Sequence, residues 1–585
     1  MRNGMLFFCF VGSLLFFPQW THGKDDPSDG TNVIGKKIDD FTLRDFRGKS
    51  LSLRELGDKK AVVVAFLGVE CPLARLYGRK LGELAREWAP RGVVFIAIDS
   101  NQQDSIPELA DFARDHQIEF PLLKDPGNEI ADRFGARRTP EVFVLDANHV
   151  IRYGGRVDDQ YGIGIQKPKP TRQDLVSAVE EVLEGKAVSR PTTDVAGCFI
   201  GKVRKPNPKG TITYTRHVAR ILQERCVECH RAGEVAPFPL TNYEEVVGWA
   251  ETIGEVVDEG RMPPWFASPE HGKFLNEGRI PDEEKRVLRE WVANGCPEGD
   301  RKDLPEPREY TVGWGMPDPD AVYAMSDTPF IVPAEGVIEY QNYTVDPKWT
   351  EDKWISGAEA RPGNRSVVHH ILVFIRRPKK IYHPMLPGEL VSAYAPGMKP
   401  TVAHADDMAV LAPAGSKIVF QVHYTPNGTE QRDISQVGFR FRDPKDVKME
   451  IKAGMAINIF FKIPPRNENY PVTASHVFTE DSLLLGVNPH MHLRGKSFRY
   501  EAIYPDGRKE IVMDCPRYDF NWQLGYQFAE PLPMPKGTQI LCTAHFDNSE
   551  NNPSNPDPER AVRFGEQTWE EMMIGWFFSA EKRKD

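Results

Sequence analysis

The 585-residue chain lacks the features that mark membrane-spanning or nucleic-acid-binding proteins. Beyond its N-terminal segment, no apolar run approaches the roughly 18 residues that a transmembrane helix needs, so we expect no membrane span in the mature chain. The chain has no basic run, and its formal net charge of −10 argues against a nucleic-acid partner. Tandem repeats and long low-complexity tracts are also missing. The length instead indicates several domains.

Cysteine is scarce, with eight residues in the whole chain. Cys9 lies in an apolar N-terminal core that follows a short basic start and precedes small residues near position 23. This pattern is typical of a signal peptide, predicted over residues 1–23, so we expect an exported protein in the bacterial periplasm or another extracytoplasmic space. Without Cys9, seven cysteines remain. Because that number is odd, at least one is expected to be free, reactive or paired between chains.

Two of these cysteines belong to the most informative motif in the chain, Cys226-Val-Glu-Cys229-His230. C-x-x-C-H is the attachment sequence of a c-type haem, in which the two thiols bond to the haem and the imidazole binds its iron. The alternative interpretation is a zinc half-site or a stray cysteine pair. The motif predicts a covalent haem c and therefore a protein that moves electrons.

The N-terminal part of the chain alternates apolar strands with amphipathic helices. Strands are expected at 61–66, 93–98 and 141–145, and a helix at 72–88. This alternation predicts an α/β domain with a mostly parallel sheet, assigned to residues 24–200. A linker rich in Pro, Gly and Lys is expected over 201–210. A mainly helical domain follows over 211–300, with helices at 215–226 and 284–291.

From about residue 310 onward, Pro, Gly and Asn turns separate short β-rich runs, which lie at 367–374, 417–424, 457–463, 482–487 and 539–546. This pattern is typical of antiparallel β-sandwiches, and its length predicts two of them, assigned to residues 310–455 and 456–580. The predicted fold class is therefore multidomain. It comprises one α/β domain, one all-α domain and two all-β, jelly-roll-like sandwich domains.

Cys71 lies between a buried strand and a helix N-terminus, where the helix dipole and free N–H groups stabilise a thiolate. Together with Thr139-Pro140 before a later strand, it resembles the redoxin and peroxiredoxin branch of the thioredoxin-like superfamily over about residues 35–190. The resemblance implies that Pro140 is a cis-proline facing Cys71. Two residues depart from it: Ala74 stands where a thioredoxin has its second cysteine, and Gly68 where a peroxiredoxin has Thr or Ser.

A peroxiredoxin would also carry its catalytic arginine at the position of Pro140. Cys198 is a candidate resolving thiol for Cys71, distant in sequence. The alternative is that Cys71 is a buried cysteine in a domain retained for packing.

The helical segment resembles small class I cytochromes c over residues 211–300. In that family the sixth haem ligand is a methionine in a Pro-rich loop, which Met262 in Arg261-Met-Pro-Pro matches, and such a thioether raises the reduction potential. His271 competes for this position. The other interpretation of Met262 is ordinary packing.

Five histidines form three clusters in the β-rich half: His369-His370, His423, and His490-Met-His492. In a strand, residues i and i+2 share a face, so His490 and His492 can bind one metal. The adjacent pair normally points to opposite faces and needs strand twist or a strand end to converge.

These clusters resemble the copper type II, ascorbate-dependent monooxygenases, peptidylglycine α-hydroxylating monooxygenase and dopamine β-monooxygenase. In that family each of two β-sandwich domains binds one copper. The resemblance implies that the first copper is held by His369, His370 and His423, and that the second is held by His490, His492 and Met572. Imidazole suits both copper oxidation states, and a thioether stabilises Cu(I). A metal-free sandwich or a zinc site is the alternative.

In that family a disulfide-bonded cysteine follows the ligand methionine directly. This chain has Met573 at that position, so Met573 is an alternative copper ligand. The strand cysteine with which the family's cysteine pairs resembles Cys542, and the candidate disulfide in this chain is therefore Cys515 with Cys542. His545 is an additional histidine close to this region.

The combined prediction is an exported, copper-dependent monooxygenase that uses O₂ to hydroxylate an unknown small-molecule or peptide substrate. Electrons would come from a donor protein or reductant through the haem; the first copper would relay them and the second would activate O₂. One alternative is a non-catalytic electron-transfer or copper-handling protein. A further alternative is a thiol peroxidase with appended electron-transfer modules, which Gly68 and Ala74 count against.

Overall fold

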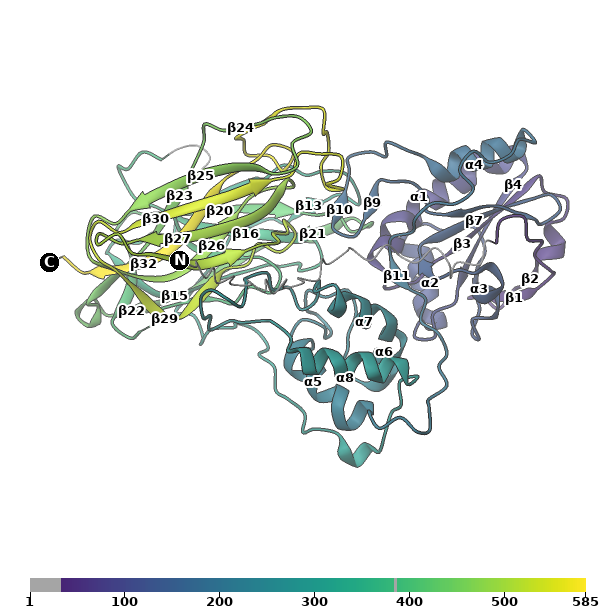
Figure 1. Ribbon diagram of the computed structural model, residues 1–585, viewed down its shortest axis with the longest axis horizontal. Coiled ribbons are helices and arrows are strands. Elements are labelled where there is room, and N and C mark those ends of the chain that lie inside the picture. Colours follow the sequence, from purple (N-terminus) through teal and green to yellow (C-terminus); the bar gives the residue numbers. More distant parts are fainter. Residues whose placement is uncertain (1–32, 383–386, 404, 585) are drawn as a thin grey trace, which may run out of the picture.

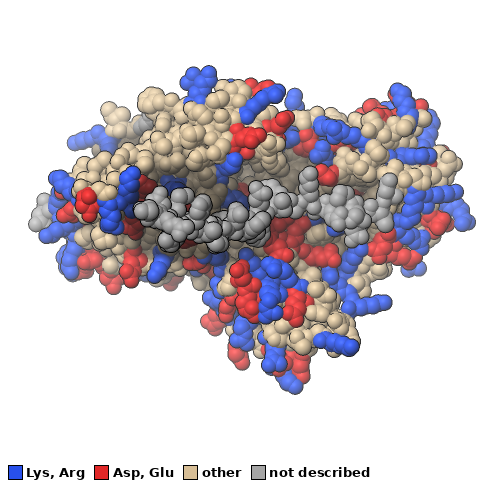
Figure 2. Space-filling model, viewed as in Figure 1, with Lys and Arg blue, Asp and Glu red and all other residues tan. Residues whose placement is uncertain are grey.

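A computed structural model describes residues 33–382, 387–403 and 405–584; the predicted signal peptide at 1–23 lies outside these ranges. Figure 1 shows an α/β domain at one end, a large β region at the other and a group of helices beside both. Among the described residues, no helix is long and apolar enough to cross a membrane. Figure 2 shows acidic and basic side chains intermingled over the face viewed.

The α/β domain is built on a seven-stranded sheet of order β2-β1-β5-β4-β3-β7-β8. Its three central strands β5, β4 and β3 run parallel, whereas β7, β8, β1 and β2 pair antiparallel with their neighbours. The sheet is therefore mixed, and the prediction of a mostly parallel sheet is wrong. Short turns join β1 to β2 and β7 to β8, and such turns cannot make the crossover that parallel pairing requires. The strands are β1 (Thr42–Asp45), β2 (Ser50–Ser52), β3 (Ala61–Phe66), β4 (Val93–Asp99), β5 (Leu122–Lys124), β7 (Glu141–Asp146) and β8 (Ile151–Gly155).

Helices cover both faces of this sheet, and every residue of β3 is buried. Val63 packs in a core with residues of α1, α2 and α4, while Val62 and Val64 pack on the other face with α3. This two-sided burial explains the continuous apolar run of the strand. The remaining elements are η1 (Leu53–Leu56), α1 (Pro72–Trp88), η2 (Ala89–Arg91), α2 (Ile106–Asp115), α3 (Glu129–Phe134), β6 (Arg138–Thr139), β9 (Tyr161–Gly162), β10 (Ile165–Gln166), α4 (Asp174–Leu183) and β11 (Cys198–Phe199).

Residues 200–320 are all described, and apart from an isolated bridge between Phe274 and Phe528 their regular structure is helical. The helices pack around a core that contains the buried Trp249 and Trp291. The predicted helix at 215–226 begins as a π-helix and continues as α5. Its assignment to a cytochrome domain stays a prediction. The elements are η3 (Tyr214–Val218), α5 (Ala219–Arg225), α6 (Tyr243–Gly248), α7 (Ala250–Asp258), α8 (Asp282–Ala293) and η4 (Arg301–Asp303).

The β region contains two four-stranded sheets, β14-β20-β16-β17 and β25-β30-β27-β28, and a nine-stranded sheet of order β12-β22-β15-β19-β23-β32-β26-β29, with β18 beside β15. Two short pairs, β13 with β21 and β24 with β31, complete it. The strands of its first half are β12 (Ala321–Ala324), β13 (Phe330–Val332), β14 (Gln341–Val345), β15 (Lys353–Arg361), β16 (Val368–Arg376), β17 (Glu389–Tyr394), β18 (Thr401–Val402), β19 (Met408–Ala412), β20 (Lys417–Tyr424), β21 (Gln431–Asp433) and β22 (Gln436–Arg442), followed by η5 (Pro444–Asp446). Those of the second half are β23 (Met449–Ile457), β24 (Lys462–Ile463), β25 (Tyr470–Val477), β26 (Ser482–His490), β27 (Gly495–Ile503), β28 (Lys509–Cys515), β29 (Tyr526–Met534), β30 (Gln539–Phe546), β31 (Val562–Arg563) and β32 (Ile574–Lys582).

One sheet runs through both halves because β19 pairs in parallel with β23. The predicted boundary after residue 455 lies inside β23, which pairs along its length with β32. The strand predicted at 457–463 is broken in the structure. Asn458 ends it, since its side chain accepts a hydrogen bond from the Phe460 N–H and donates one to the Thr473 carbonyl, an alternative to ladder pairing.

Candidate functional site

The thiol site lies where β3 passes into α1. Cys71 is the N-cap residue of α1, with Pro72 in the first turn, and its side chain is fully buried. Its Sγ lies 2.9 Å from the Thr139 carbonyl oxygen. The Thr139–Pro140 peptide bond is cis, which confirms the prediction for Pro140.

Cys198 reaches Cys71 through the short strand β11. β11 pairs with β6 so that Cys198 stands opposite Thr139, the residue that contacts Cys71. Burial alone would raise the pKa of Cys71, but hydrogen bonds, first from the Cys198 side chain and then from the Thr139 side chain, lower that pKa to about 6. The same hydrogen bond, together with burial, raises the pKa of Cys198 well above its ordinary value. The pair therefore holds one thiolate and one thiol at neutral pH.

The departure at Gly68 has a structural reason. A Cβ atom at this position would overlap the side-chain amide of Asn101. Asn101 is held in place because its amide donates to Asp104 and its oxygen accepts from the Gly201 N–H. A Thr or Ser of the peroxiredoxin type has no room at position 68 while Asn101 stays there.

The C-x-x-C-H motif follows α5 in a tight turn. The N–H groups of Cys229 and His230 both donate to the Cys226 carbonyl. The His230 Nδ1 lies 3.1 Å from the Phe238 carbonyl oxygen, and burial lowers the pKa of this histidine. A donating Nδ1–H leaves the Nε2 lone pair for a metal, the arrangement expected of a ligating histidine. These donors fit the predicted haem.

Met262 follows α7, and its N–H donates to the Val256 carbonyl in the last turn of that helix. Its ligation of a haem iron stays a prediction. The competing His271 lies in a segment attached to the second half of the β region, since the Ser268 N–H donates to Asp514 and the Leu275 N–H to Gln527.

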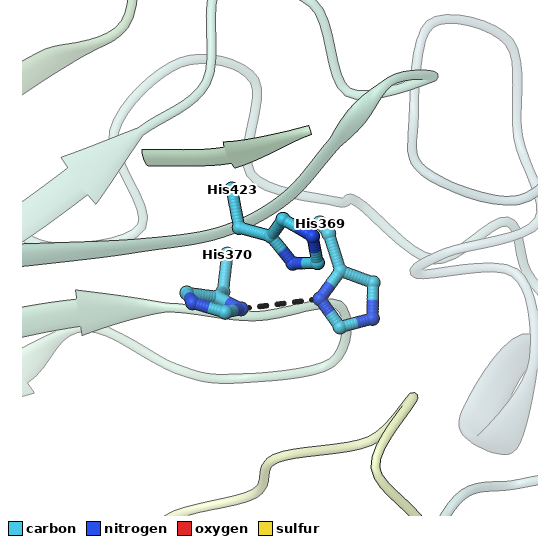
Figure 3. A group of neighbouring side chains, drawn as sticks. All are labelled: His369, His370 and His423. Carbon is cyan, nitrogen blue, oxygen red and sulfur yellow. Dashed lines mark hydrogen bonds between the residues drawn. The ribbon is translucent and has the colours of Figure 1, made fainter. Parts of the chain in front are cut away.

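The first histidine cluster is the clearest metal-type site in the described part of the chain (Figure 3). His369, His370 and His423 each offer a nitrogen, and these atoms all lie within 4.8 Å of one another. His370 stands opposite His423 in the β16–β20 ladder, and a β-bulge between Val368 and His370 absorbs the extra residue His369. The bulge supplies the convergence that an ideal strand forbids, because it turns both adjacent rings inward.

Burial keeps these three imidazoles neutral. It lowers the pKa of His369 to about 4 and the pKa values of His370 and His423 well below the ordinary range. The His369 and His370 Nδ1 atoms lie 3.1 Å apart, while His369 Nε2 and His423 Nδ1 are buried without a hydrogen-bond partner among the described residues. Neutral, closely spaced nitrogens are what copper or zinc requires, so the residues fit a metal ion.

The second histidine cluster lies at the end of β26. Its two rings are 5.3 Å apart between centroids. The His490 Nδ1 lies 2.7 Å from Gln523 Oε1 and the His492 Nδ1 lies 3.4 Å from the Glu570 carbonyl oxygen, which orients both rings. The His492 Nε2 is buried and has no hydrogen-bond partner among the described residues. Two oriented imidazoles fit a metal here also.

The two candidate methionines occupy different surroundings. Met572 is buried and lines a cavity together with His490. Met573 is fully buried in the core between the sheets of the second half. Of the two, Met572 shares a cavity with His490, and its ligation of a copper stays a prediction. His545 instead contacts Ser497, on the ladder between β27 and β30.

The candidate disulfide between Cys515 and Cys542 is wrong, because both thiols are free and buried. They lie on β28 and β30, and β27 runs between these two strands. Two strand spacings separate their Cα atoms by roughly 10 Å, beyond disulfide reach.

A cavity of about 230 Å³ lies between the two histidine clusters. His370 lines it from the first cluster, and His490 and Met572 line it from the second. Phe520 connects the clusters on another side, with ring centroids 5.3 Å from His369 and 5.9 Å from His492. Gln523 and Phe520 could not be predicted from the sequence, because neither belongs to a motif.

Comparisons with known proteins identify the α/β domain. Residues 34–154 match the AhpC/TSA family. The thiol-disulfide oxidoreductase ResA of Halalkalibacterium halodurans is 31% identical over 119 residues, which are 20% of this chain and 65% of ResA. ResA of Bacillus thuringiensis is 28% identical over 113 residues, 19% of this chain and 64% of that protein. A chloroplastic peroxiredoxin Q of Oryza sativa is 28% identical over 140 residues, 23% of this chain and 63% of that protein.

The chain thus spans just under two-thirds of the length of these relatives. Among solved structures, a hypothetical protein from Sinorhizobium meliloti has 31% sequence identity and a TM-score of 0.27, covering 29% of this chain and 94% of that one. The chain contains a thioredoxin-like, redoxin-type domain, and this domain makes it similar to oxidoreductases.

Proposed function

We propose that the α/β domain carries out thiol–disulfide exchange with Cys71 and Cys198 as its redox pair. The observation that carries this proposal is the contact between the two thiols, which lowers the pKa of Cys71 to about 6. The thiolate is the reacting form of cysteine, so Cys71 is ionised at neutral pH while Cys198 stays protonated. The similarity to ResA supports the same chemistry.

The exchange is balanced as a two-electron reaction. The Cys71 thiolate attacks an external disulfide, forms a mixed disulfide and releases the first external thiolate. Cys198 then loses its proton and attacks Cys71 Sγ, which closes the Cys71–Cys198 disulfide and releases the second external thiolate. The external disulfide is reduced, the pair is oxidised, and an external dithiol returns it to the reduced form. Because Cys71 is fully buried, residues that cover it must move during the first attack.

The test is reduction of a self-quenched fluorescent glutathione disulfide by the full-length protein. We expect Cys71→Ser to lose this activity and Cys198→Ser to stop at a mixed disulfide detectable by mass spectrometry. Cys296→Ser, at a buried cysteine in the helical segment, is the matched control and should keep full activity. Undiminished reduction by Cys71→Ser contradicts the proposal. Peroxide consumption that depends on Cys71, without disulfide reduction, supports the thiol peroxidase alternative instead.

A second candidate function is suggested by the histidine clusters: we propose that the β region is a copper-dependent monooxygenase module. Its support is the pair of buried, neutral imidazole groups on opposite sides of one cavity. His369, His370 and His423 would hold one copper, and His490, His492 and Met572 the other. Bound copper would supply O₂ activation and one-electron transfer. The chain's own part is to keep the rings oriented through Gln523 and the Glu570 carbonyl.

The haem motif and the first histidine cluster are linked by an ion pair. Arg365, four residues before His369, lies 3.0 Å from Glu234, four residues after His230. Tyr394, paired with Ile371 next to His370, lies under the Arg365 guanidinium at 6.0 Å. A haem c held by Cys226, Cys229 and His230 would supply one electron at a time. This contact favours delivery of those electrons to the β region. We also propose an extracytoplasmic location, because haem is attached to such motifs there.

Metal analysis of the full-length protein tests this second function. We expect about two coppers and one iron per chain, with His423→Ala and His490→Ala each losing one copper and retaining the iron. Zinc in place of copper, or fewer than one copper in fully metallated protein, contradicts the two-copper proposal. Loss of substrate-dependent O₂ consumption in His490→Ala, with Cys71→Ser unaffected, would separate this activity from the thiol chemistry.

A further inference from the structure

The cavity between the histidine clusters has mainly apolar walls. Leu372 and Phe374 line it from β16, and Ile574 and Trp576 line it from β32. Its volume is about 230 Å³. A dry cavity of about 150 Å³ is enough to hold benzene, so this one has room for a single ring with a small substituent.

No Lys, Arg, Asp or Glu is among the described residues that line the cavity. The nearest carboxylate in its hydrogen-bond network is Glu566, which lies behind Gln421 at 3.4 Å from its Nε2. Burying an unpaired charge costs far more than burying an uncharged group. The walls therefore disfavour both carboxylate and ammonium groups in a ligand.

Tyr340 is one of the lining residues, and its hydroxyl oxygen is buried without a hydrogen-bond partner among the described residues. Its ring lies edge-on to His370 and His423, with centroids 5.5 and 4.9 Å away, so the first cluster fixes its position. Gln421, another uncharged polar side chain of the lining, already donates to Asn342 and Glu566. A buried hydroxyl without a partner is costly, and a ligand that hydrogen-bonds to it removes this cost.

We propose that the cavity binds an uncharged, mainly apolar substrate of one ring, whose single polar group hydrogen-bonds to the Tyr340 hydroxyl. The inference that this ligand is a substrate rests on the monooxygenase function proposed above. The binding itself depends only on the cavity. The ligand would lie between His370 on one side and His490 with Met572 on the other.

The experiment is calorimetric titration of the full-length protein, as purified and after chelator treatment, with four probes that share one ring. These are toluene, 4-methylphenol, 4-methylbenzoate and 4-methylbenzylammonium. We expect the first two to bind and 4-methylphenol to bind tightest. The two charged probes should bind at least about 100-fold more weakly to the chelated protein. Equal or tighter binding of either charged probe, or no binding by any of the four, overturns the proposal.

Three variants locate the binding. Tyr340→Phe should weaken 4-methylphenol about five-fold and leave toluene unchanged, because it removes one hydrogen bond. Tyr343→Phe, three residues along at a tyrosine that does not line the cavity, should change neither. Leu372→Trp fills the space and should abolish both. Unchanged binding by Leu372→Trp places the probes elsewhere and overturns the proposal.

This experiment separates two failures. If the neutral probes bind as expected but the copper analysis fails, the cavity proposal stands and the monooxygenase function falls. If copper and O₂ consumption are confirmed but the chelated protein prefers charged probes, the substrate class proposed here is wrong.

Discussion

Cys71 and the two histidine clusters are both largely shielded from solvent, yet the cysteine is charged and the histidines are neutral. At Cys71, hydrogen bonds from Cys198 and Thr139 overcome the effect of burial and lower the pKa to about 6. At His369, burial acts without such partners and lowers the pKa to about 4. Cys71 is therefore in the form of cysteine that acts as a nucleophile, and the imidazoles are in the form that can ligate a metal.

Burial disfavours the charged form at both sites; the hydrogen-bond donors that face Cys71 outweigh it, whereas the acceptors that face His490 and His492 do not. The sulfur of Cys71 meets donors, including the N–H groups of Cys198 and Ala74, which stabilise negative charge. The imidazoles of the second cluster direct their Nδ1 atoms at oxygen acceptors, Gln523 Oε1 and the Glu570 carbonyl. Changing these partners, while burial is kept constant, tests the comparison directly.

The largest expected effect is on the thiolate. Cys198→Ala removes the first of the hydrogen bonds that lower the pKa of Cys71, and a hydrogen bond to a charged group contributes about 1.5–3 kcal/mol, equivalent to roughly one to two pH units. We therefore expect the pKa of Cys71 to rise by that amount, measured from thiolate absorbance near 240 nm. Cys198→Ser keeps a donor and should shift the pKa less. Equal shifts in the two variants would show that packing, not the hydrogen bond, sets the pKa.

The second-largest expected effect is on metal affinity at the second histidine cluster, through the orientation of its rings. Gln523→Leu keeps the volume but removes the acceptor for His490 Nδ1. Loss of such an outer partner typically costs about 10–100-fold in metal affinity. We expect this loss at the second site only, measured by competition with a copper chelator, and the first cluster serves as the internal control. An equal loss at both sites would point to a change in the fold instead.

The two sites should also lose stability in different pH ranges. The folded pKa of Cys71, about 6, is below the ordinary thiol value of about 8.5, so its contribution is complete above that value and is lost as pH falls to 6. His369 and His490, with folded pKa values of about 4, contribute fully above about 6.5 and lose this contribution as pH falls to 4. Each group changes stability by up to about 1.4 kcal/mol per pH unit within its range.

Urea unfolding of the metal-free protein, with the α/β domain and the β region followed separately by pulsed hydrogen exchange at one labelling pH, measures both ranges. Cys71→Ser should flatten the profile of the α/β domain between pH 6 and 8.5, and His369→Asn that of the β region below 6.5. If both regions weaken over the same range, burial rather than local partners controls both sites.

Sequence reasoning succeeded where a local motif determines the structure. The helix Pro72–Trp88 and the strands Lys417–Tyr424 and Gln539–Phe546 begin and end as predicted, since their apolar periodicity and turn residues are local signals. The strand directions in the sheet of the α/β domain and the disulfide of Cys515 were predicted wrongly, because both depend on the order of the strands. Strand order is a long-range property that no short window contains.

The candidate sites show the same division. The histidines could be selected from their clustering, but the bulge that brings His369 beside His370 could not, since no Gly or Pro marks it. Gln523 and Tyr340 act through contacts with residues at least 30 positions away and carry no motif. Sequence motifs therefore predict candidate metal ligands better than they predict the residues that orient those ligands.

The smallest expected effect concerns the link between the helical segment and the β region. The Arg365–Glu234 pair remains partly accessible to solvent, with side chains 23% and 16% exposed, so we expect Arg365→Gln to weaken docking by no more than about 1 kcal/mol. Faster hydrogen exchange in residues 226–240 would report this loss. Arg289→Gln removes an exposed ion pair with Asp258 in the same segment and should have no measurable effect on that exchange.

A charge-swapped double variant, Arg365→Glu with Glu234→Arg, separates the two contacts of Arg365. Because Arg365 also lies over Tyr394, this variant should restore only the ionic contribution to docking. Complete restoration would mean that charge alone holds the haem motif against the first cluster. No change in Arg365→Gln would assign that role to apolar packing, as burial, not charge, already dominates at the histidines.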